Sequence, residues 1–211
     1  MNDNQLLSAK WASSMIKRVG WSILDTETTG LGAGARIVQL ALIDESGHEL
    51  INTLINPMRV IQPEATAIHG ITNEMVKDAP IFEEVLISIL KATGDGDVVI
   101  FNAEYDLRCI RSSAASTGIY LAFPTSERRQ CRIFPNGGSI HCAMLQYARF
   151  VGEWSDYHQD YKFQKLPGGD HTALGDCRAT LALIGSMANA YDERAESAQI
   201  QEIAPPQDET I

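Results

Sequence analysis

Residues 21–30 read Trp-Ser-Ile-Leu-Asp-Thr-Glu-Thr-Thr-Gly, a short apolar run that leads into two acids. The apolar start predicts a buried β-strand, in which alternate side chains point to one face. Asp25 and Glu27 are two positions apart, so we expect both carboxylates on the same face. Carboxylates so placed repel each other, and a hard divalent cation such as Mg²⁺ or Mn²⁺ would relieve the repulsion. Taken alone, the pair also fits two solvated acids at a strand end.

A second acidic motif, Phe-Asn-Ala-Glu-Tyr-Asp at residues 101–106, ends an apolar stretch that predicts another buried strand. Asn102 is expected to be the N-cap of a helix that runs to about residue 117, just before Gly118. Asp106 then falls in the first turns of this helix. A carboxylate there is favoured by the helix dipole alone. Asp106 therefore becomes a candidate metal ligand only beside the other acids.

A third motif, His-Thr-Ala-Leu-Gly-Asp, occupies residues 171–176. Residues five apart on an α-helix are separated by about 140° around its axis, so His171 and Asp176 cannot both face one site from a regular helix. We therefore expect His171 in a loop before a helix and Asp176 in the first turns of that helix. A lone histidine in such a loop would be a surface residue. Next to a metal-binding acid it is a candidate general base.

In this order and spacing, the three motifs resemble those of the DnaQ-like 3′-to-5′ exonucleases, and the histidine five residues before the last acid is typical of the DEDDh subgroup. Residues 67–76 also resemble the segment that these enzymes carry between the first two motifs. The resemblance covers about residues 21–190. It implies an α/β, RNase H-like fold: a mixed sheet of about five strands, the first three antiparallel and the later ones parallel, flanked by helices.

The resemblance also implies a site with two Mg²⁺ or Mn²⁺ ions. Asp25, Glu27 and Asp176 would hold one ion, Asp25 would bridge to the second, and Asp106 would support the second largely through water. His171 would take the proton from the attacking water, and the product would be a nucleoside 5′-monophosphate released from a 3′ end. Six residues would bind the terminal nucleotide: Thr28, Gly30, Leu31, His69, Asn102 and Tyr105, with Leu31 as a wedge against the last base.

Residues 30–35 also match the glycine-rich fingerprint of dinucleotide-binding proteins. That fingerprint requires a helix to begin within the glycines, so that its N-terminus meets the pyrophosphate. Residues 36–44 are instead rich in β-branched side chains and are followed, after a turn, by a second strand. The pattern indicates a strand meander and not a nucleotide-binding βαβ unit.

The remaining patterns predict an α/β domain at residues 21–190. A helical extension at residues 1–20, with Leu6, Leu7, Trp11, Met15 and Ile16 as its apolar face, precedes the domain. An acidic tail at residues 191–211, expected to be disordered, follows it. We expect strands at residues 21–25, 36–44, 48–56, 97–102 and 139–142, and helices near residues 80–93, 103–117, 143–151 and 171–190.

The net charge is −10, and the tail contributes −5 of it through six acids and one arginine. Two divalent ions would nearly cancel the remaining −5. We therefore expect brief capture of a single-stranded or frayed 3′ end, with weak salt dependence, and not the wrapping of a duplex. The loop at residues 118–139, with Arg128, Arg129 and Arg132, is expected to be solvated, and contact of this loop with nucleic acid is the alternative.

The four cysteines form no Cys-x-x-Cys pair, so structural zinc is not expected and free thiols fit a reducing cytosol. No signal-peptide pattern is present, and no apolar run approaches the ~18 residues of a membrane span. We therefore expect a cytoplasmic protein that does not bind membranes.

The sequence leaves the substrate open between DNA and RNA, because no motif reveals contacts to the 2′-hydroxyl group. The expected partners are single-stranded DNA or RNA 3′ ends and the mononucleotide product. An RNA-processing exoribonuclease of the same family and a non-catalytic nucleic-acid-binding or scaffold module are the alternatives. The sequence leaves open whether the chain forms a homodimer or binds a polymerase-type partner.

Overall fold

The computed structural model describes residues 1–121 and 138–203, with side chains up to residue 197. Its centre is a five-stranded sheet in the order β3-β2-β1-β4-β5. β1 pairs antiparallel with β2, β2 pairs antiparallel with β3, and β1 and β5 both lie parallel to β4. The mixed sheet expected from the sequence is confirmed. The strands are β1 (Ser22–Thr28), β2 (Ile37–Asp44), β3 (Glu49–Leu54), β4 (Val98–Ile100) and β5 (Ile140–Cys142).

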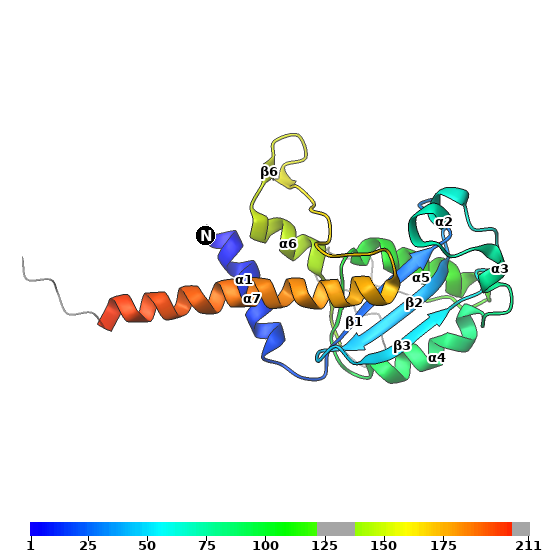
Figure 1. The fold of residues 1–211 in the computed structure, drawn as a ribbon, viewed down its shortest axis with the longest axis horizontal. Coiled ribbons are helices and arrows are strands. Elements are labelled where there is room, and N and C mark those ends of the chain that lie inside the picture. The colour runs from blue at the N-terminus through cyan, green and yellow to red at the C-terminus, as the bar shows by residue number, and fades with distance from the viewer. Residues whose placement is uncertain (122–137, 204–211) are drawn as a thin grey trace, which may run out of the picture.

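Alternation along β1 divides the interior into two apolar layers. Leu24 belongs to the layer formed with α4 (Phe82–Thr93) and α5 (Ala103–Ser116). Ile23 belongs to the layer formed with α1 (Asp3–Ile16), α6 (Ala143–Val151) and α7 (Ala173–Ile203). The sheet is therefore covered by helices on both faces (Figure 1). Asp25 and Glu27 continue the row of Ile23, which directs them toward the α7 layer.

Helix α1 packs through small side chains and not through the apolar face that we expected. Its capping box joins Asn2 and Gln5, and its buried residues are Ser8, Ala9, Ala12, Ser13 and Met15. Leu7 and Ile16 are exposed instead. Small side chains allow α1 to approach α7 closely, and the two helices are in contact where they cross (Figure 1). The predicted apolar face is therefore wrong at Leu7 and Ile16 and right at Met15.

Helix α7 is longer than predicted and extends well beyond the sheet (Figure 1). We expected it to end near residue 190 and to be followed by a disordered segment, whereas the helix continues to Ile203. The predicted disorder is therefore wrong for residues 191–203. Asp192 accepts hydrogen bonds of 2.9 Å from the Ser13 hydroxyl and the Lys17 ammonium group, so α1 holds the extended part of α7. Residues 204–211 lie outside the described residues.

Three short features were not predicted. α2 (Pro63–His69) and α3 (Asn73–Val76) lie between β3 and α4, and a small core of Val38, Ile61, Ala65, Ile71 and Val76 fixes them to the sheet. β6 (Trp154–Ser155) and β7 (Asp160–Tyr161) form a separate hairpin. The arginines expected in the 118–139 loop lie outside the described residues. None of the helices in the described part of the chain has the length and apolar character needed to cross a bilayer.

Candidate active site

Three carboxylates from the two ends of the domain converge beside β1. Oxygen atoms of Asp25, Glu27 and Asp176 all lie within 4.8 Å of one another. β1 supplies the first two from one face, as their spacing predicts, and the first turn of α7 supplies the third. Clustered carboxylate oxygens are the ligands that Mg²⁺ and Mn²⁺ prefer. The donor set therefore fits a divalent cation.

Asp106 reaches the same region from α5 but is held separately. Its side chain is buried, and Oδ1 accepts a hydrogen bond of 2.6 Å from the hydroxyl of Thr26. Thr26 lies between Asp25 and Glu27, so alternation turns it toward the opposite face, on which α5 packs. The structure thus brings the fourth acid to the neighbourhood of the other three without including it in their cluster.

The acids have pKa values far from those of free carboxyl groups. Burial raises the pKa of Asp25 well above its usual range, and the charges of Asp106, Asp176 and Glu27 raise it further. Burial and then the charge of Asp176 raise the pKa of Glu27 to about 8. Burial likewise raises the pKa of Asp106 to about 7, against the opposing hydrogen bond from Thr26. A bound cation would favour the charged forms, so the fold holds these acids in an arrangement that a cation would stabilise.

The loop before α7 is attached to the acid cluster through Asp176. Oδ1 of Asp176 accepts hydrogen bonds from the backbone N–H groups of Asp170 at 2.9 Å and His171 at 3.3 Å. The hydroxyl of Thr172 accepts from the N–H of Gly175 and caps the helix. His171 therefore precedes the helix and Asp176 lies in its first turn, as predicted.

His171 itself is exposed and has a left-handed backbone, with φ of +61°. This conformation is uncommon for a residue other than glycine and often marks a functional position. The ring is near enough to Asp176 to affect it electrostatically. Burial raises the pKa of Asp176, whereas the two backbone hydrogen bonds and the His171 ring lower it.

Two of the predicted nucleotide-binding side chains meet at the end of β1. The hydroxyl groups of Thr28 and Tyr105 are 2.5 Å apart, and the Tyr105 hydroxyl donates to the carbonyl of Gly30 at 2.9 Å. Gly30 has φ of +140°, and a Cβ atom there would lie 2.1 Å from Oε1 of Gln62. The Gln62 side chain could move away, but the positive φ itself favours glycine at position 30, because other residues rarely adopt it.

The other three predicted residues have different surroundings. Nδ1 of His69 accepts a hydrogen bond from the N–H of Ile71, so Nε2 carries the proton that it donates to the carbonyl of Thr28 at 3.1 Å. Burial lowers the pKa of His69, in agreement with a neutral ring. Leu31 is 78% exposed. Asn102 is the N-cap residue of α5, but its side chain makes no capping hydrogen bond.

Sequence reasoning missed Thr26 and Arg108 as parts of the site. Thr26 is signalled by its place between two acids, since strand alternation directs it away from them. The guanidinium carbon of Arg108 lies 5.0 Å from the centre of the Tyr105 ring, and Nη2 approaches the carbonyl of Leu31 at 3.5 Å. The three-residue spacing of Tyr105 and Arg108 on a helix is the available signal for this pair.

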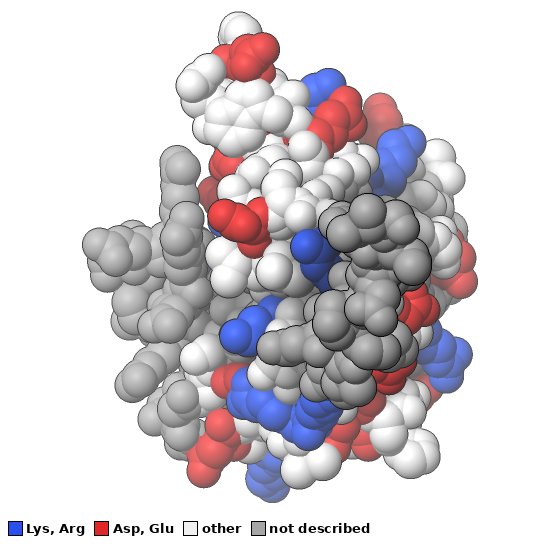
Figure 2. All heavy atoms as spheres, turned by 90° about the vertical axis from the view of Figure 1, so that its left-hand side faces the viewer, with Lys and Arg blue, Asp and Glu red and all other residues white. Residues whose placement is uncertain are grey.

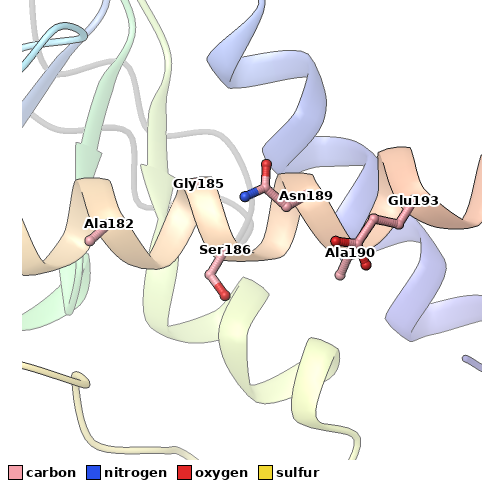
Figure 3. A pocket seen from close by; sticks show the side chains of 6 residues that line it. All are labelled: Ala182, Gly185, Ser186, Asn189, Ala190 and Glu193. Carbon is pink, nitrogen blue, oxygen red and sulfur yellow. The ribbon is translucent and has the colours of Figure 1, made fainter.

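A shallow pocket on α7 is separate from the acids. Figure 3 shows its six lining side chains on one face of the helix: Ala182, Gly185, Ser186, Asn189, Ala190 and Glu193. None of them belongs to the predicted site, and the pocket begins about 9 Å along the axis from Asp176. Figure 2 views the molecule from the left-hand side of Figure 1, and in this view basic and acidic side chains are interspersed among the described residues. Neither feature adds a residue to the acid cluster.

An RNase H-like sheet with an acid cluster beside its central strand defines the class of this protein: it is a nuclease. The chain belongs to the exonuclease family, because the sequence profile described as "Exonuclease" matches residues 22–184. Its fold and motifs are those of the DnaQ-like DEDDh enzymes. The protein is thus an exonuclease, a hydrolase that acts on nucleic acid.

Individual relatives agree with this assignment. The chain is 40% identical to an uncharacterized exonuclease, CP81, of Escherichia phage 186 over 176 residues, which is 78% of this chain and 86% of that protein. It is 39% identical to the DNA polymerase III subunit epsilon of Rickettsia conorii over 201 residues, with 88% of this chain and 82% of the relative covered.

Solved structures give the same picture. Exonuclease X in complex with 5′-overhanging duplex DNA is 29% identical, with a TM-score of 0.52 over 82% of this chain and 93% of that one. The nuclease domain of 3′hExo, a DEDDh family member bound to rAMP, has a TM-score of 0.57 at 14% identity, over 82% of this chain and 94% of that one. The second likeness shows the shared fold alone.

Proposed function

We propose that this exonuclease degrades nucleic acid from the 3′ end with two Mg²⁺ or Mn²⁺ ions and releases nucleoside 5′-monophosphates. The observation that carries the proposal is the convergence of Asp25, Glu27 and Asp176 oxygens within 4.8 Å. Burial and mutual repulsion disfavour the charged forms of these acids unless a cation binds. A module that only bound or scaffolded nucleic acid would gain nothing from this arrangement, so the catalytic function is better supported.

In this proposal Asp25, Glu27 and Asp176 hold one ion, and Asp25 and Asp106 hold the second. Bound divalent ions would stabilise negative charge on the oxygens of the scissile phosphate. The chain's own contribution is orientation. Backbone N–H groups of the loop before α7 fix Asp176, and the Thr26 hydroxyl fixes Asp106. Asp176 and Asp106 therefore each have one carboxylate oxygen held in place by a hydrogen bond from the protein.

His171 is proposed as the general base that takes the proton from the attacking water. Its backbone N–H is hydrogen-bonded to Asp176, and its exposed side chain is close enough to Asp176 to affect the pKa of that acid. An imidazole is suited to this role because it accepts a proton near neutral pH. It need not touch a metal ion to do so.

The terminal nucleotide is proposed to lie against Thr28, Gly30, Leu31, His69, Asn102 and Tyr105. The linked hydroxyl groups of Thr28 and Tyr105 give this pocket a fixed polar wall. The exposed Leu31 side chain would lie against the last base. Asn102 is available for a ligand because its side chain does not cap α5.

DNA is the proposed substrate, with RNA as the alternative. Two relatives support this choice through what their names state: exonuclease X was solved with 5′-overhanging duplex DNA, and the Rickettsia conorii protein is a DNA polymerase subunit. Because one relative is a polymerase subunit, we also propose that this chain binds a polymerase-type partner. We accordingly include duplex 3′ ends beside single strands among the proposed substrates.

The test compares oligonucleotides of one sequence with Mg²⁺ present: linear DNA, linear RNA, DNA with a blocked 3′-hydroxyl, DNA with a blocked 5′ end, and circular single-stranded DNA. We expect mononucleotide release from linear DNA and from the 5′-blocked form, and resistance of the 3′-blocked and circular forms. Asp176→Asn should be inactive on all of them. Efficient cutting of circles, or protection by the 5′ block, would refute the 3′-to-5′ assignment.

A further inference from the structure

Gln39 of β2 faces the start of α7 from a position beside the acid cluster. In the antiparallel register of β1 and β2, Gln39 lies directly across from Glu27. Residues directly opposite each other in an antiparallel pair share one face of the sheet, so Gln39 lies on the face that α7 covers. Its side chain is half-buried there. No motif in the sequence includes Gln39, and β2 supplies no acid of the cluster.

A hydrogen bond from Gln39 reaches the first residue of α7. Oε1 of Gln39 accepts a hydrogen bond of 3.2 Å from the backbone N–H of Ala173, 134 positions away along the chain. The first four N–H groups of an α-helix have no acceptor within the helix. Ala173 is fully buried, so water does not reach this N–H. Gln39 therefore supplies an acceptor that neither the helix nor the solvent replaces.

The Gln39 amide is itself held in one orientation. A backbone N–H can only donate, so the Gln39 atom that faces Ala173 is the oxygen. The amide nitrogen, Nε2, donates to Oδ1 of Asn52 on β3 at 3.1 Å. A chain of hydrogen bonds thus runs from β3 through β2 to the first turn of α7.

The first turn of α7 also carries an acid of the cluster. Asp176 lies three residues after Ala173, and its oxygen lies within 4.8 Å of those of Asp25 and Glu27. A shift of this turn away from the sheet would therefore open the cluster. Cys177 also contacts the sheet, with Sγ 3.6 Å from carbonyl oxygens of β1 and β2, but a thiol is a weak donor. The Gln39 amide is the stronger polar link between the sheet and this turn.

We propose that Gln39 is a positioning residue for the metal site: it holds the first turn of α7 at the distance from β1 at which Asp176 completes the acid cluster. The inference rests on the proposed function, which makes these acids the metal ligands. Gln39 acts through the N–H of Ala173 and does not touch an ion. Removing a group that orients metal ligands typically lowers metal affinity or activity about 10- to 100-fold. Gln39 accordingly sets the affinity for the cation and not the binding of nucleic acid.

The test measures Mn²⁺ binding by titration calorimetry in Gln39→Met, which keeps the length of the side chain and removes the acceptor. We expect Mn²⁺ affinity to fall about 10- to 100-fold and the Mg²⁺ concentration for half-maximal activity to rise by a similar factor. KM for a single-stranded oligonucleotide at saturating Mg²⁺ should keep the wild-type value. Gln39→Glu retains an acceptor for Ala173 and should bind Mn²⁺ at least as tightly as the wild type. Gln146→Met, at another half-buried glutamine, on α6, is the matched control and should bind Mn²⁺ like the wild type.

Asn52→Ala removes the group that directs the Gln39 amide. Its Mn²⁺ affinity should fall by up to about fivefold, the contribution of one neutral hydrogen bond. If Gln39→Met does not fold, Asn52→Ala decides, and wild-type Mn²⁺ affinity in this variant then overturns the proposal.

A residue that supports only the fold would lower the melting temperature and leave the Mn²⁺ affinity of the folded protein unchanged. That result in Gln39→Met would overturn the proposal, and so would a rise in KM without a change in Mn²⁺ affinity. Asp176→Asn in the same titration separates these outcomes from failure of the proposed function. If Asp176→Asn also binds Mn²⁺ like the wild type, the metal assignment itself fails; if only Asp176→Asn loses Mn²⁺, the role of Gln39 alone is wrong.

Discussion

The backbone N–H of His171 donates a hydrogen bond of 3.3 Å to Oδ1 of Asp176, so the proposed base and an acid of the cluster are joined through the protein itself. Asp176 therefore has two roles in the structure: it faces Asp25 and Glu27, and it holds the loop on which His171 lies. Removing Asp176 would disturb both, whereas removing the His171 side chain leaves the backbone hydrogen bond in place. The two residues can thus be tested separately.

His171→Gly and His171→Asn should lower kcat about 10²- to 10⁴-fold, the usual cost of losing a positioned general base. Both replacements tolerate the left-handed backbone at this position, so the loop should keep its path. Mn²⁺ affinity, followed by titration calorimetry, should stay near the wild-type value. His158→Asn, at another exposed histidine, is the control. If either His171 variant keeps more than about half of the single-turnover rate, the general-base assignment is wrong.

Glu27→Gln should abolish activity and yet raise the melting temperature of the protein in EDTA at pH 8. The pKa of Glu27 is about 8 in the folded chain and 4.5 for a free group, so folding favours the protonated carboxyl. Its contribution to stability is complete below pH 4.5 and is lost as the pH rises toward 8. Thermal unfolding across this range should show the wild type losing more stability than the variant.

Glu49→Gln is the control for this experiment, because Glu49 is exposed on β3 and its substitution removes the same charge. Its melting curve should follow the wild type at each pH. Added Mn²⁺ should stabilise the wild type most at high pH, where the carboxylates would otherwise repel, and should not stabilise Glu27→Gln to the same extent. A Glu27→Gln protein that binds Mn²⁺ like the wild type would contradict the metal assignment.

Thr26→Val should raise the pKa of Asp106 further, because it removes the hydroxyl that donates to Oδ1 at 2.6 Å. A hydrogen bond to a charged group contributes about 1.5–3 kcal/mol, so the Mg²⁺ concentration for half-maximal activity should rise roughly tenfold or more. The increase in the required Mg²⁺ concentration should be larger at pH 6.5 than at pH 8.5, since a larger fraction of Asp106 is protonated at the lower pH. Thr26→Ser restores the donor and should restore the Mg²⁺ dependence. An unchanged Mg²⁺ dependence in Thr26→Val would remove Thr26 from the site.

Tyr105→Phe should raise KM more than it lowers kcat. The lost hydroxyl contacts Thr28 and donates to Gly30, so the variant loosens the wall of the proposed nucleotide pocket without removing an acid. A hydrogen bond of this kind contributes about 1 kcal/mol, which corresponds to roughly a fivefold change in KM. Tyr157→Phe, at a residue that is 90% exposed, is the matched control. A fall in kcat at unchanged KM would place Tyr105 in the chemical step instead.

Deleting residues 1–19 should destabilise the protein far more than deleting residues 192–211. Ala12 and Met15 of α1 are buried against α7 residues such as Ile184 and Met187, so the first deletion exposes an apolar layer. The second deletion removes the exposed ion pair of Asp192 with Lys17, and such pairs contribute little. Differential scanning calorimetry of both truncations would measure the two losses of melting temperature. Equal losses of melting temperature would show that the extended part of α7 is as important as α1.

The strands and the acid cluster were predictable because their signals are local. Alternation along β1 places Asp25 and Glu27 together, and the five-residue spacing to Asp176 places His171 before the helix. The end of α7 was not predictable from hydrophobicity, because residues 191–203 offer few apolar side chains. Their alanines, glutamates and glutamines are nevertheless good helix formers that continue an existing helix. The Thr26–Asp106 contact joins distant segments, and no pattern in one sequence specifies it.

The packing of α1 against α7 has a consequence for how the enzyme is made. Helix α1 packs on α6 and α7, and Asp176, in α7, completes the cluster begun by Asp25. Domains in general assemble only when distant segments have been synthesised. A nascent chain therefore has no complete metal site until the segment with Asp176, about 150 residues after Asp25, has been synthesised. The order of the elements thus delays the appearance of a hydrolytic activity until α7 has left the ribosome and can fold onto the strand that carries Asp25.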